Sequence, residues 1–122
     1  MKVSRIITQL RTTDIDASID FFLKVLGFDL AFKFSDFYAG ISVAGQLFHL
    51  KLVDEKDPSI KFVADNGHFH LFIELDDVDT MAEHIRQHGG ELQNEVHDTD
   101  WDTREFSVID DQGHTIYFAQ AL

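Results

Sequence analysis

The fold is decided by the stretch TTDIDASIDFFLKVLGFDL, residues 12–30, because a diverged copy of its frame returns as LDDVDTMAEHIRQHGGEL, residues 75–92. Asp14 in the first copy corresponds to Asp77 in the second at a constant offset. Each copy is typical of the end of a strand, a short amphipathic helix and a glycine that precedes the next strand. The repeat predicts two similar halves that face each other.

Length and composition indicate one domain with internal symmetry. A chain of 122 residues, 44% of them hydrophobic, buries one core and is too short for two independent domains, so we expect a single domain over residues 1–122. Residues 54–67 hold the only proline and an Asn-Gly pair, which predicts a connector between modules at about 1–53 and 68–122. The sequence has no cysteine, which excludes disulfides and thiolate ligands.

The net charge of the chain indicates which classes of partner it can bind. Twenty-two acidic residues against 10 Lys and Arg give a net charge of −12, which argues against nucleic acid and permits a cationic ligand. The N-terminal residues 1–10 have no apolar run long enough for a signal peptide, and no later segment is long enough to span a bilayer. We therefore expect a cytoplasmic protein with no membrane partner.

Hydrophobic periodicity predicts the same order of elements in each half, β-α-β-β-β, and hence an α+β fold. The helices are indicated by apolar stripes at helical spacing, namely Ile19, Phe22, Leu23 and Leu26 in the first half and Val78, Met81, Ala82 and Ile85 in the second. Alternating residues predict strands at 3–12, 28–34, 37–43, 46–53, 68–75, 91–96, 104–109 and 114–119.

Three segments in this order resemble the vicinal oxygen chelate superfamily of glyoxalases, extradiol dioxygenases, fosfomycin-resistance enzymes and bleomycin-resistance proteins. They are DIDASIDFFLKVLGF from Asp14, HLFIELDDVD from His70 and REFSVIDDQGHTIYF from Arg104. The resemblance implies two pseudo-symmetric modules that form a curved mixed sheet around a cleft, with the helices on the outer face. It also implies a homodimer.

Within that superfamily the chain most resembles the bleomycin-resistance proteins. FYAG at residues 37–40 and WDTREF at residues 101–106 are similar to segments of those proteins. Two departures stand out, because Asp102 and Thr103 replace a usual glycine, and Asp111-Gln112 replaces the usual Pro-Asp or Pro-Ala before the last turn glycine.

The resemblance also locates the four metal-ligand positions of the family's enzymes, which fall on Ile7, His49, His70 and Tyr117. Only His49 and His70 are good ligands for a divalent metal, and an enzyme of this family needs three. Gln9 and His68 share the inward faces of their strands and could substitute. We expect no cofactor and no catalytic residue; the alternative is a divalent metal such as Zn, Mn, Ni or Fe on His49 and His70.

Aromatic side chains suggest a binding surface instead. Flat rings can sandwich a planar ligand, and the acids around Trp101 can attract a cation. Arg11 occupies a position where glyoxalases, which this segment resembles, hold a substrate carboxylate, and it could equally pair with Glu74 or Glu105. The predicted ligand-binding residues are Arg11, Tyr38, His49, His70, Trp101, Arg104, Phe106 and Tyr117.

We therefore predict a protein that holds a hydrophobic or planar, optionally cationic small molecule in a dimer-interface cleft without turnover, as bleomycin-resistance proteins sequester an antibiotic. One alternative is a metal-dependent lyase, isomerase or dioxygenase that uses His49 and His70. Another is a dimerisation module that binds no ligand. His84 and His88, one helical turn apart and off the apolar stripe, are expected in solvent.

Overall fold

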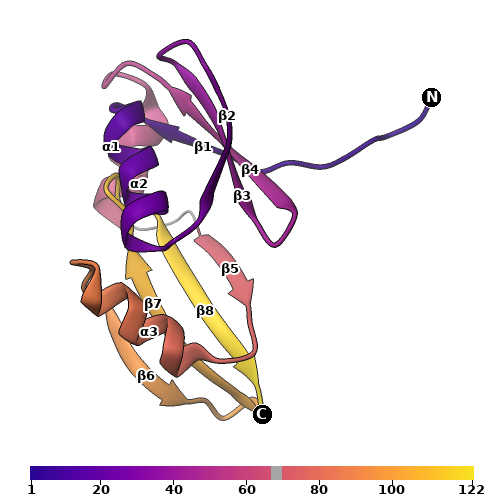
Figure 1. Cartoon of the computed structure of the whole chain (residues 1–122). Coiled ribbons are helices and arrows are strands. Elements are labelled where there is room, and N and C mark those ends of the chain that lie inside the picture. The colour runs from indigo at the N-terminus through magenta and orange to yellow at the C-terminus, as the bar shows by residue number, and fades with distance from the viewer. Residues whose placement is uncertain (67–69) are drawn as a thin grey trace.

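The computed structural model describes residues 1–66 and 70–122, whose strands form two four-stranded sheets (Figure 1). The first sheet has the strand order β1-β4-β3-β2 and the second β5-β8-β7-β6, so each half builds one sheet in the same way. In each sheet the pair β1–β4 or β5–β8 is parallel and the other neighbours are antiparallel. The α+β class and the duplicated module are confirmed.

The elements of the first half are β1 (Gln9–Thr12), α1 (Ile15–Asp20), η1 (Phe21–Val25), β2 (Asp29–Phe34), β3 (Tyr38–Val43) and β4 (Gln46–Leu52). After α2 (Pro58–Asn66), the second half has β5 (His70–Glu74), α3 (Val78–Gln87), β6 (Asn94–Asp98), β7 (Thr103–Ile109) and β8 (Thr115–Ala121). None of the helices in the described part of the chain is long and apolar enough to cross a membrane.

The two repeated helices begin with the same cap. The carboxylate of Asp14 accepts a hydrogen bond from the Ala17 backbone N–H at 3.0 Å, and that of Asp77 accepts one from Thr80 N–H at 3.0 Å. Each bond satisfies a donor that a helix start leaves without an intrahelical partner. The helices then differ, because α1 continues into the π-helical turn η1 whereas α3 ends as an α-helix.

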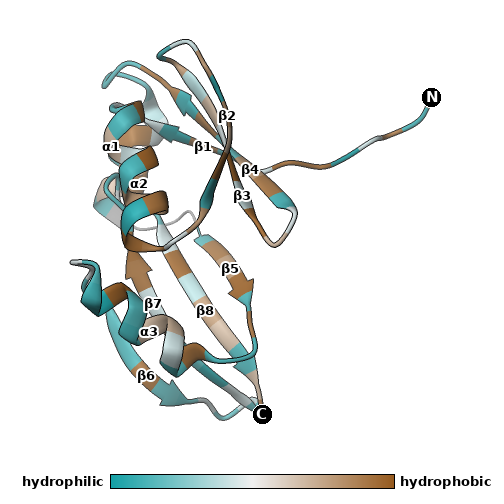
Figure 2. Cartoon of the chain, viewed as in Figure 1, coloured by the Kyte–Doolittle hydropathy of each residue, from teal (hydrophilic) through white to brown (hydrophobic). Residues whose placement is uncertain are grey.

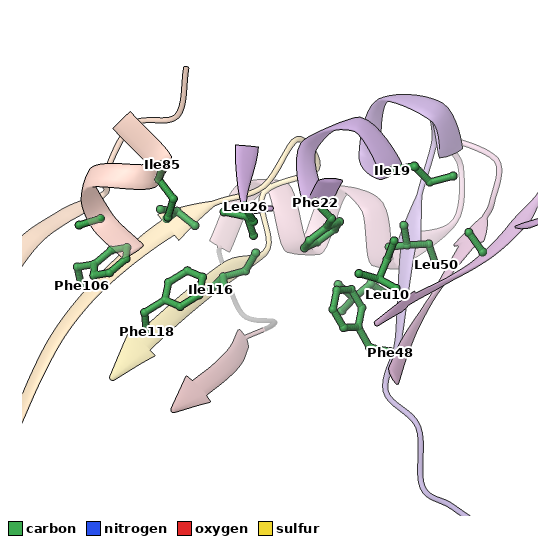
Figure 3. Close-up of a cluster of buried hydrophobic side chains, with 14 of the residues drawn as sticks. Leu10, Ile19, Phe22, Leu26, Phe48, Leu50, Ile85, Phe106, Ile116 and Phe118 are labelled. Carbon is green, nitrogen blue, oxygen red and sulfur yellow. The ribbon is translucent and has the colours of Figure 1, made fainter. Parts of the chain in front are cut away.

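Hydrophobic residues recur along the strands and helices of both halves (Figure 2). Their buried members form one hydrophobic core that joins the two halves on the helix-covered side of both sheets (Figure 3). Phe22 packs edge-on against Phe48 with ring centroids 5.0 Å apart, and Phe28 reaches Phe118 of the second half at 6.4 Å. Figure 3 shows Phe22 and Leu26 between the buried side chains of the first sheet and those of the second. Each sheet therefore buries the face toward α1 or α3; we call the opposite face its inner face.

The first strand is shorter than predicted. The strand expected over residues 3–12 begins at Gln9, and residues 1–8 form an extended arm that leaves the body of the molecule (Figure 1). Ile6 in this arm is 95% exposed. The alternation predicted a strand correctly only where β4 offers a partner, because an extended segment needs neighbouring backbone groups to become part of a sheet.

The segment predicted to connect the two modules contains a helix that the sequence analysis did not predict, because residues 58–66 form α2. The carboxylate of Asp57 accepts from the Ser59 backbone N–H at 2.9 Å, and Pro58 supplies the first helical residue, where its missing N–H costs nothing. Val63 is buried, and Gly113 lets the β7–β8 turn approach α2, since a Cβ there would lie 3.0 Å from Ala64 Cα.

Two further boundaries are corrected. The strand predicted at 91–96 lies at residues 94–98, and the strand predicted from residue 68 is described from His70 onward. His84 is not a solvated side chain as expected, because its Nε2 is buried without a hydrogen-bond partner in the described residues and lies against Gly27. It thus contributes to the contact between the two halves.

Candidate ligand-binding site

The sheet register aligns the inner faces of the two halves residue by residue. Gln9 lies opposite His49 in the first sheet, and Phe72 lies opposite Tyr117 in the second. Two positions farther along β4 and β8, Lys51 faces Tyr38 and Ala119 faces Glu105. In this register His49 therefore corresponds to Tyr117, and the neutral Tyr38 corresponds to the acidic Glu105.

The first inner face is filled by its own side chains. The Phe32 ring lies on Gly40, so closely that a Cβ on that residue would collide with the ring. Phe32 stacks at 6.3 Å on Tyr38 and meets His49 edge-on at 5.2 Å. The Tyr38 hydroxyl accepts a hydrogen bond from Gln9 Nε2 at 3.0 Å and lies 3.0 Å from His49 Nδ1. The Tyr38 hydroxyl is thus bonded to both of its polar neighbours.

Two effects favour the neutral form of His49 at this position. Burial lowers the pKa of its imidazole, and the positive charge of Arg5 lowers it further. Its Nε2 is buried and has no hydrogen-bond partner among the described residues. A neutral imidazole with one unpaired nitrogen is compatible with either packing or metal binding. Which of the two roles His49 has therefore depends on the side chains around it.

The second inner face is open. Asn94 stands opposite Ser107, as Phe32 stands opposite Gly40 in the first sheet, and its amide donates to the Ser107 hydroxyl at 3.3 Å. The smaller side chain leaves a cavity of about 420 Å³. The cavity is lined by Phe72, Asn94, His97, Trp101, Glu105, Phe106 and Tyr117. Aromatic walls with a few polar groups are typical of small-molecule sites.

Trp101 and Glu105 are joined across the turn between β6 and β7. The indole Nε1–H donates to Glu105 Oε2 at 3.1 Å, and the Thr103 hydroxyl donates to the same oxygen at 2.7 Å. The Trp101 side chain is 67% exposed, whereas Glu105 is only 6% exposed. The carboxylate therefore orients a mostly exposed indole at the mouth of the cavity.

The two predicted metal ligands lie on different sheets. His49 belongs to β4, whereas His70 belongs to β5 and stacks on Tyr117 with ring centroids 5.5 Å apart. Within residues 1–66 and 70–122, no three His, Asp or Glu side chains come together as a metal-ligand group. The described residues of one chain thus do not form the three-ligand centre that the family's enzymes need. His68, the predicted substitute ligand, lies outside the described residues.

Both predicted arginines are already paired. Arg11 forms an ion pair with Asp57 at 2.8 Å, rather than with Glu74 or Glu105 as considered from the sequence. Arg104 binds Asp79 at 2.9 Å and Asp98 at 2.8 Å, and these carboxylates raise the pKa of its guanidinium. Arg104 alternates with Glu105 along β7 and thus lies on the helix-covered side of the sheet.

Of the eight predicted ligand-binding residues, the structure brings Trp101, Phe106 and Tyr117 to the open cavity, with His70 beside Tyr117. Phe106 belongs mainly to the core, because it is 1% exposed and stacks on Phe118 at 5.0 Å. Tyr38 and His49 lie together on the filled inner face. The predicted set is therefore divided between the two sheets.

A second hollow of about 430 Å³ lies between the β3–β4 turn and β5. Its walls are formed by Thr8, Val43, Ala44, Gln46, Leu47, Phe48, Leu71, Phe72, Ile73 and Glu74. It lies at the junction of the halves and lacks the convergence of aromatic rings on a buried carboxylate. We therefore take the cavity beside Trp101 as the candidate site.

Sequence reasoning missed Glu105 as a site residue and considered it only as a partner of Arg11. A signal was present, because Glu105 and Ser107 alternate with the apolar Phe106 and Val108 and thus share the inner face. The proximity of Glu105 to Trp101 depends on the turn, where Asp102 adopts a left-handed φ of 63°.

Comparison with known proteins gives one family. Residues 5–118 match the model of the Glyoxalase/Bleomycin resistance protein/Dioxygenase superfamily. Similar structures include a bleomycin-binding protein from bleomycin-producing Streptomyces verticillus complexed with copper(II)-bleomycin, at a TM-score of 0.75 and 23% identity over 100% of this chain and 99% of that chain. No curated protein matches the sequence.

Two more solved structures show the range of proteins with this fold. TnmS3, an antibiotic binding protein from Streptomyces sp. CB03234, has a TM-score of 0.75 and 23% identity over 100% of this chain and 99% of that chain. Lactoylglutathione lyase from Agrobacterium tumefaciens has a TM-score of 0.72 and 16% identity over 98% of this chain and 95% of that chain. Binding proteins and an enzyme thus share the architecture.

Proposed function

Since this chain belongs to the Glyoxalase/Bleomycin resistance protein/Dioxygenase superfamily, we propose that it binds a hydrophobic or planar small molecule without changing it chemically. The observation that carries this function is the open cavity of about 420 Å³ on the second inner face. Its aromatic side chains offer flat apolar surfaces, and binding to such surfaces needs no reactive group.

The exposure of the aromatic rings supports this function. Phe72 is 56% and Trp101 67% exposed, although large aromatic side chains gain most when removed from water. A planar molecule between Trp101, Phe72 and Tyr117 would cover their faces. A structural neighbour is described as an antibiotic binding protein, so an antibiotic-like compound is a suitable class of ligand to test.

The ligand site is completed by a second copy of the chain in this proposal. Phe32, Phe34 and Phe37 leave a further apolar surface at 40%, 64% and 45% exposure on the first half. Contiguous exposed apolar surface on a single chain marks an interaction site. Light scattering is expected to give twice the 14.0 kDa chain mass, and a monomeric mass would contradict the dimer.

The direct test is a titration followed by the fluorescence of Trp101, the only tryptophan of the sequence. Bleomycin and a panel of planar aromatic compounds are added to the purified protein, and at least one is expected to change the emission and to release heat in calorimetry. Recovery of the compound unchanged after incubation distinguishes binding from turnover.

A matched pair of variants shows whether the compound binds beside Phe72. Phe72 lines both the cavity beside Trp101 and the second hollow and is 56% exposed, whereas Phe62 on α2 lines neither and is 55% exposed. Phe72→Ala is expected to weaken binding about tenfold, in line with the loss of an aromatic contact, and Phe62→Ala to leave it unchanged. Equal effects of both substitutions would contradict this site.

A metal-dependent enzyme is the second candidate, favoured by the buried, unpartnered Nε2 of His49. It predicts stoichiometric Zn, Mn, Ni or Fe in protein purified without chelator, and loss of that metal in a variant with both His49→Ala and His70→Ala. Such a result would replace the binding function with a catalytic one.

A further inference from the structure

We propose that Glu105 is the counter-charge for a cationic group of the ligand, so that the cavity beside Trp101 selects planar organic cations over uncharged compounds of the same shape. This inference rests on the proposed binding function and specifies its ligand class. It assigns to a buried carboxylate a role that the scaffold itself does not require.

Glu105 is a buried acid with spare hydrogen-bonding capacity. It is 6% exposed, and both of its donors, the Trp101 indole and the Thr103 hydroxyl, bind the same oxygen, Oε2. Among the described residues, no hydrogen bond reaches Oε1. A carboxylate has room for about four hydrogen bonds, so at least one acceptor position remains for another molecule.

The carboxylate also lacks a positive partner within the described part of the chain. Arg11 is bound to Asp57, and Arg104 is bound to Asp79 and Asp98. His97 faces Glu105 from β6, but its Nδ1 lies 2.8 Å from the Glu95 carbonyl. Within the described residues, two neutral donors and no opposite charge therefore bind this carboxylate.

A buried charge without an opposite charge destabilises the folded state, and a bound cation would remove that cost. The first half shows that the fold does not need the acid, because Tyr38 occupies the same position in the register and is satisfied by Gln9 and His49. The acid in the second half is thus explained by what it faces, which is the cavity.

The walls of the cavity suit the same ligand. Tyr117 and Phe72 have ring centroids 6.3 Å apart at an angle of 35°, and Trp101 stands at the mouth. Aromatic faces attract cations through their negative quadrupole, most strongly when solvent is excluded. With the net charge of −12 drawing cations toward the protein, the ligand class is an aromatic ring system that bears an ammonium, guanidinium or quaternary nitrogen.

The test compares two probes of one shape and different charge, 10-methylacridinium and uncharged acridine, at a pH where acridine is deprotonated. Trp101 fluorescence and calorimetry give both affinities for the full chain. We expect the cation to bind at least about tenfold more tightly, and Glu105→Gln to remove this preference by lowering the affinity for the cation alone. The glutamine keeps an oxygen that accepts from Trp101 and Thr103.

Asp100→Asn is the matched control, because it removes one negative charge from an exposed residue next to Trp101 without altering the cavity wall. It is expected to leave the preference for the cation in place. An equal loss in Asp100→Asn and Glu105→Gln would overturn the inference, since the effect would then belong to the general field of the loop.

The remaining outcomes separate this inference from the proposed function. Equal binding of both probes to the wild type would overturn the role of Glu105 and leave the binding function standing. Binding of neither probe, nor of bleomycin, would overturn both. Thermal unfolding gives an independent readout, because Glu105→Gln removes a buried charge and should raise the melting temperature of the ligand-free protein. A lower melting temperature would indicate that the acid serves only the fold and would count against the inference.

Discussion

The two halves of the molecule share a frame and differ on one face. Both have a capped helix over a four-stranded sheet of the same order, and both contribute to one core. On the inner faces, Phe32 lies over Gly40 in the first half, whereas Asn94 faces Ser107 in the second. The difference teaches that the helix side of each module sets the fold, while the size of one pair of inner-face residues decides whether a cavity remains.

The largest effect is expected from removing a buried side chain that packs against residues of both halves. Phe118 is fully buried and contacts Phe28 of the first half and Phe106 of the second. Phe118→Ala is expected to lower the free energy of unfolding by about 3–5 kcal/mol in chemical denaturation, because it leaves a cavity in the common core. We expect a single transition; loss of only the second half in a separate transition would contradict a shared core.

The next prediction concerns a variant in which two residues of the second inner face are replaced by those at the corresponding positions of the first inner face. The double variant Asn94→Phe, Ser107→Gly recreates the Phe32–Gly40 contact and should fill the cavity beside Trp101. Affinity for a planar compound is expected to fall about tenfold or more, which corresponds to about 1.4 kcal/mol. The reciprocal variant Phe32→Asn, Gly40→Ser is the control, and an unchanged affinity in the first variant would place binding elsewhere.

Removing the aspartate that caps each of the two repeated helices is expected to have a smaller effect on stability. Asp14→Ala removes the bond to Ala17 N–H and is expected to lower the free energy of unfolding by about 1 kcal/mol. The corresponding change in the second half, Asp77→Ala, should act in the same direction. Asp14→Asn keeps an oxygen acceptor and should retain most of the stability, whereas equal losses for alanine and asparagine would argue against a capping role.

The smallest expected effect is a pH dependence that belongs to the first half alone. Burial lowers the pKa of His49, so between the lowered pKa and the ordinary value of 6.5 the unfolded chain binds more protons than the folded chain. Stability should therefore decrease as the pH falls from the ordinary value toward the lowered pKa. His49→Tyr, which installs the residue found at the corresponding position in the second half, should flatten that decrease in denaturation curves, and an unchanged slope would contradict the assignment.

Two differences between the predicted and the observed elements have a common physical origin. The alternation of residues 3–8 was interpreted as strand, but the described structure provides no neighbouring strand for that segment. The predicted connector was given no secondary structure, whereas Asp57 caps a helix there that is stabilised by burying Val63. Local patterns indicate what a segment is able to form, and the available partners decide what it forms.

The candidate site was predicted in part for the same reason. Trp101 and Tyr117 were recognised as binding residues from their chemistry and from the resemblance. Glu105 was missed because its role depends on Phe72 and Tyr117, which come from β5 and β8. Phe106 was included as one of the flat aromatic rings, whereas the alternation along β7 directs its ring into the core.

By itself, the sequence determined the repeated module, the capped helices and the apolar side of each strand, because these depend on local periodicity and spacing. It also carried the motifs whose resemblance indicated the family, which the match over residues 5–118 then showed. Only the tertiary structure decided that one inner face is filled by Phe32 and the other open beside Glu105. The reason is that a cavity is set by side chains from four strands and by the register between them, which hydrogen bonds across the sheet define and local sequence does not.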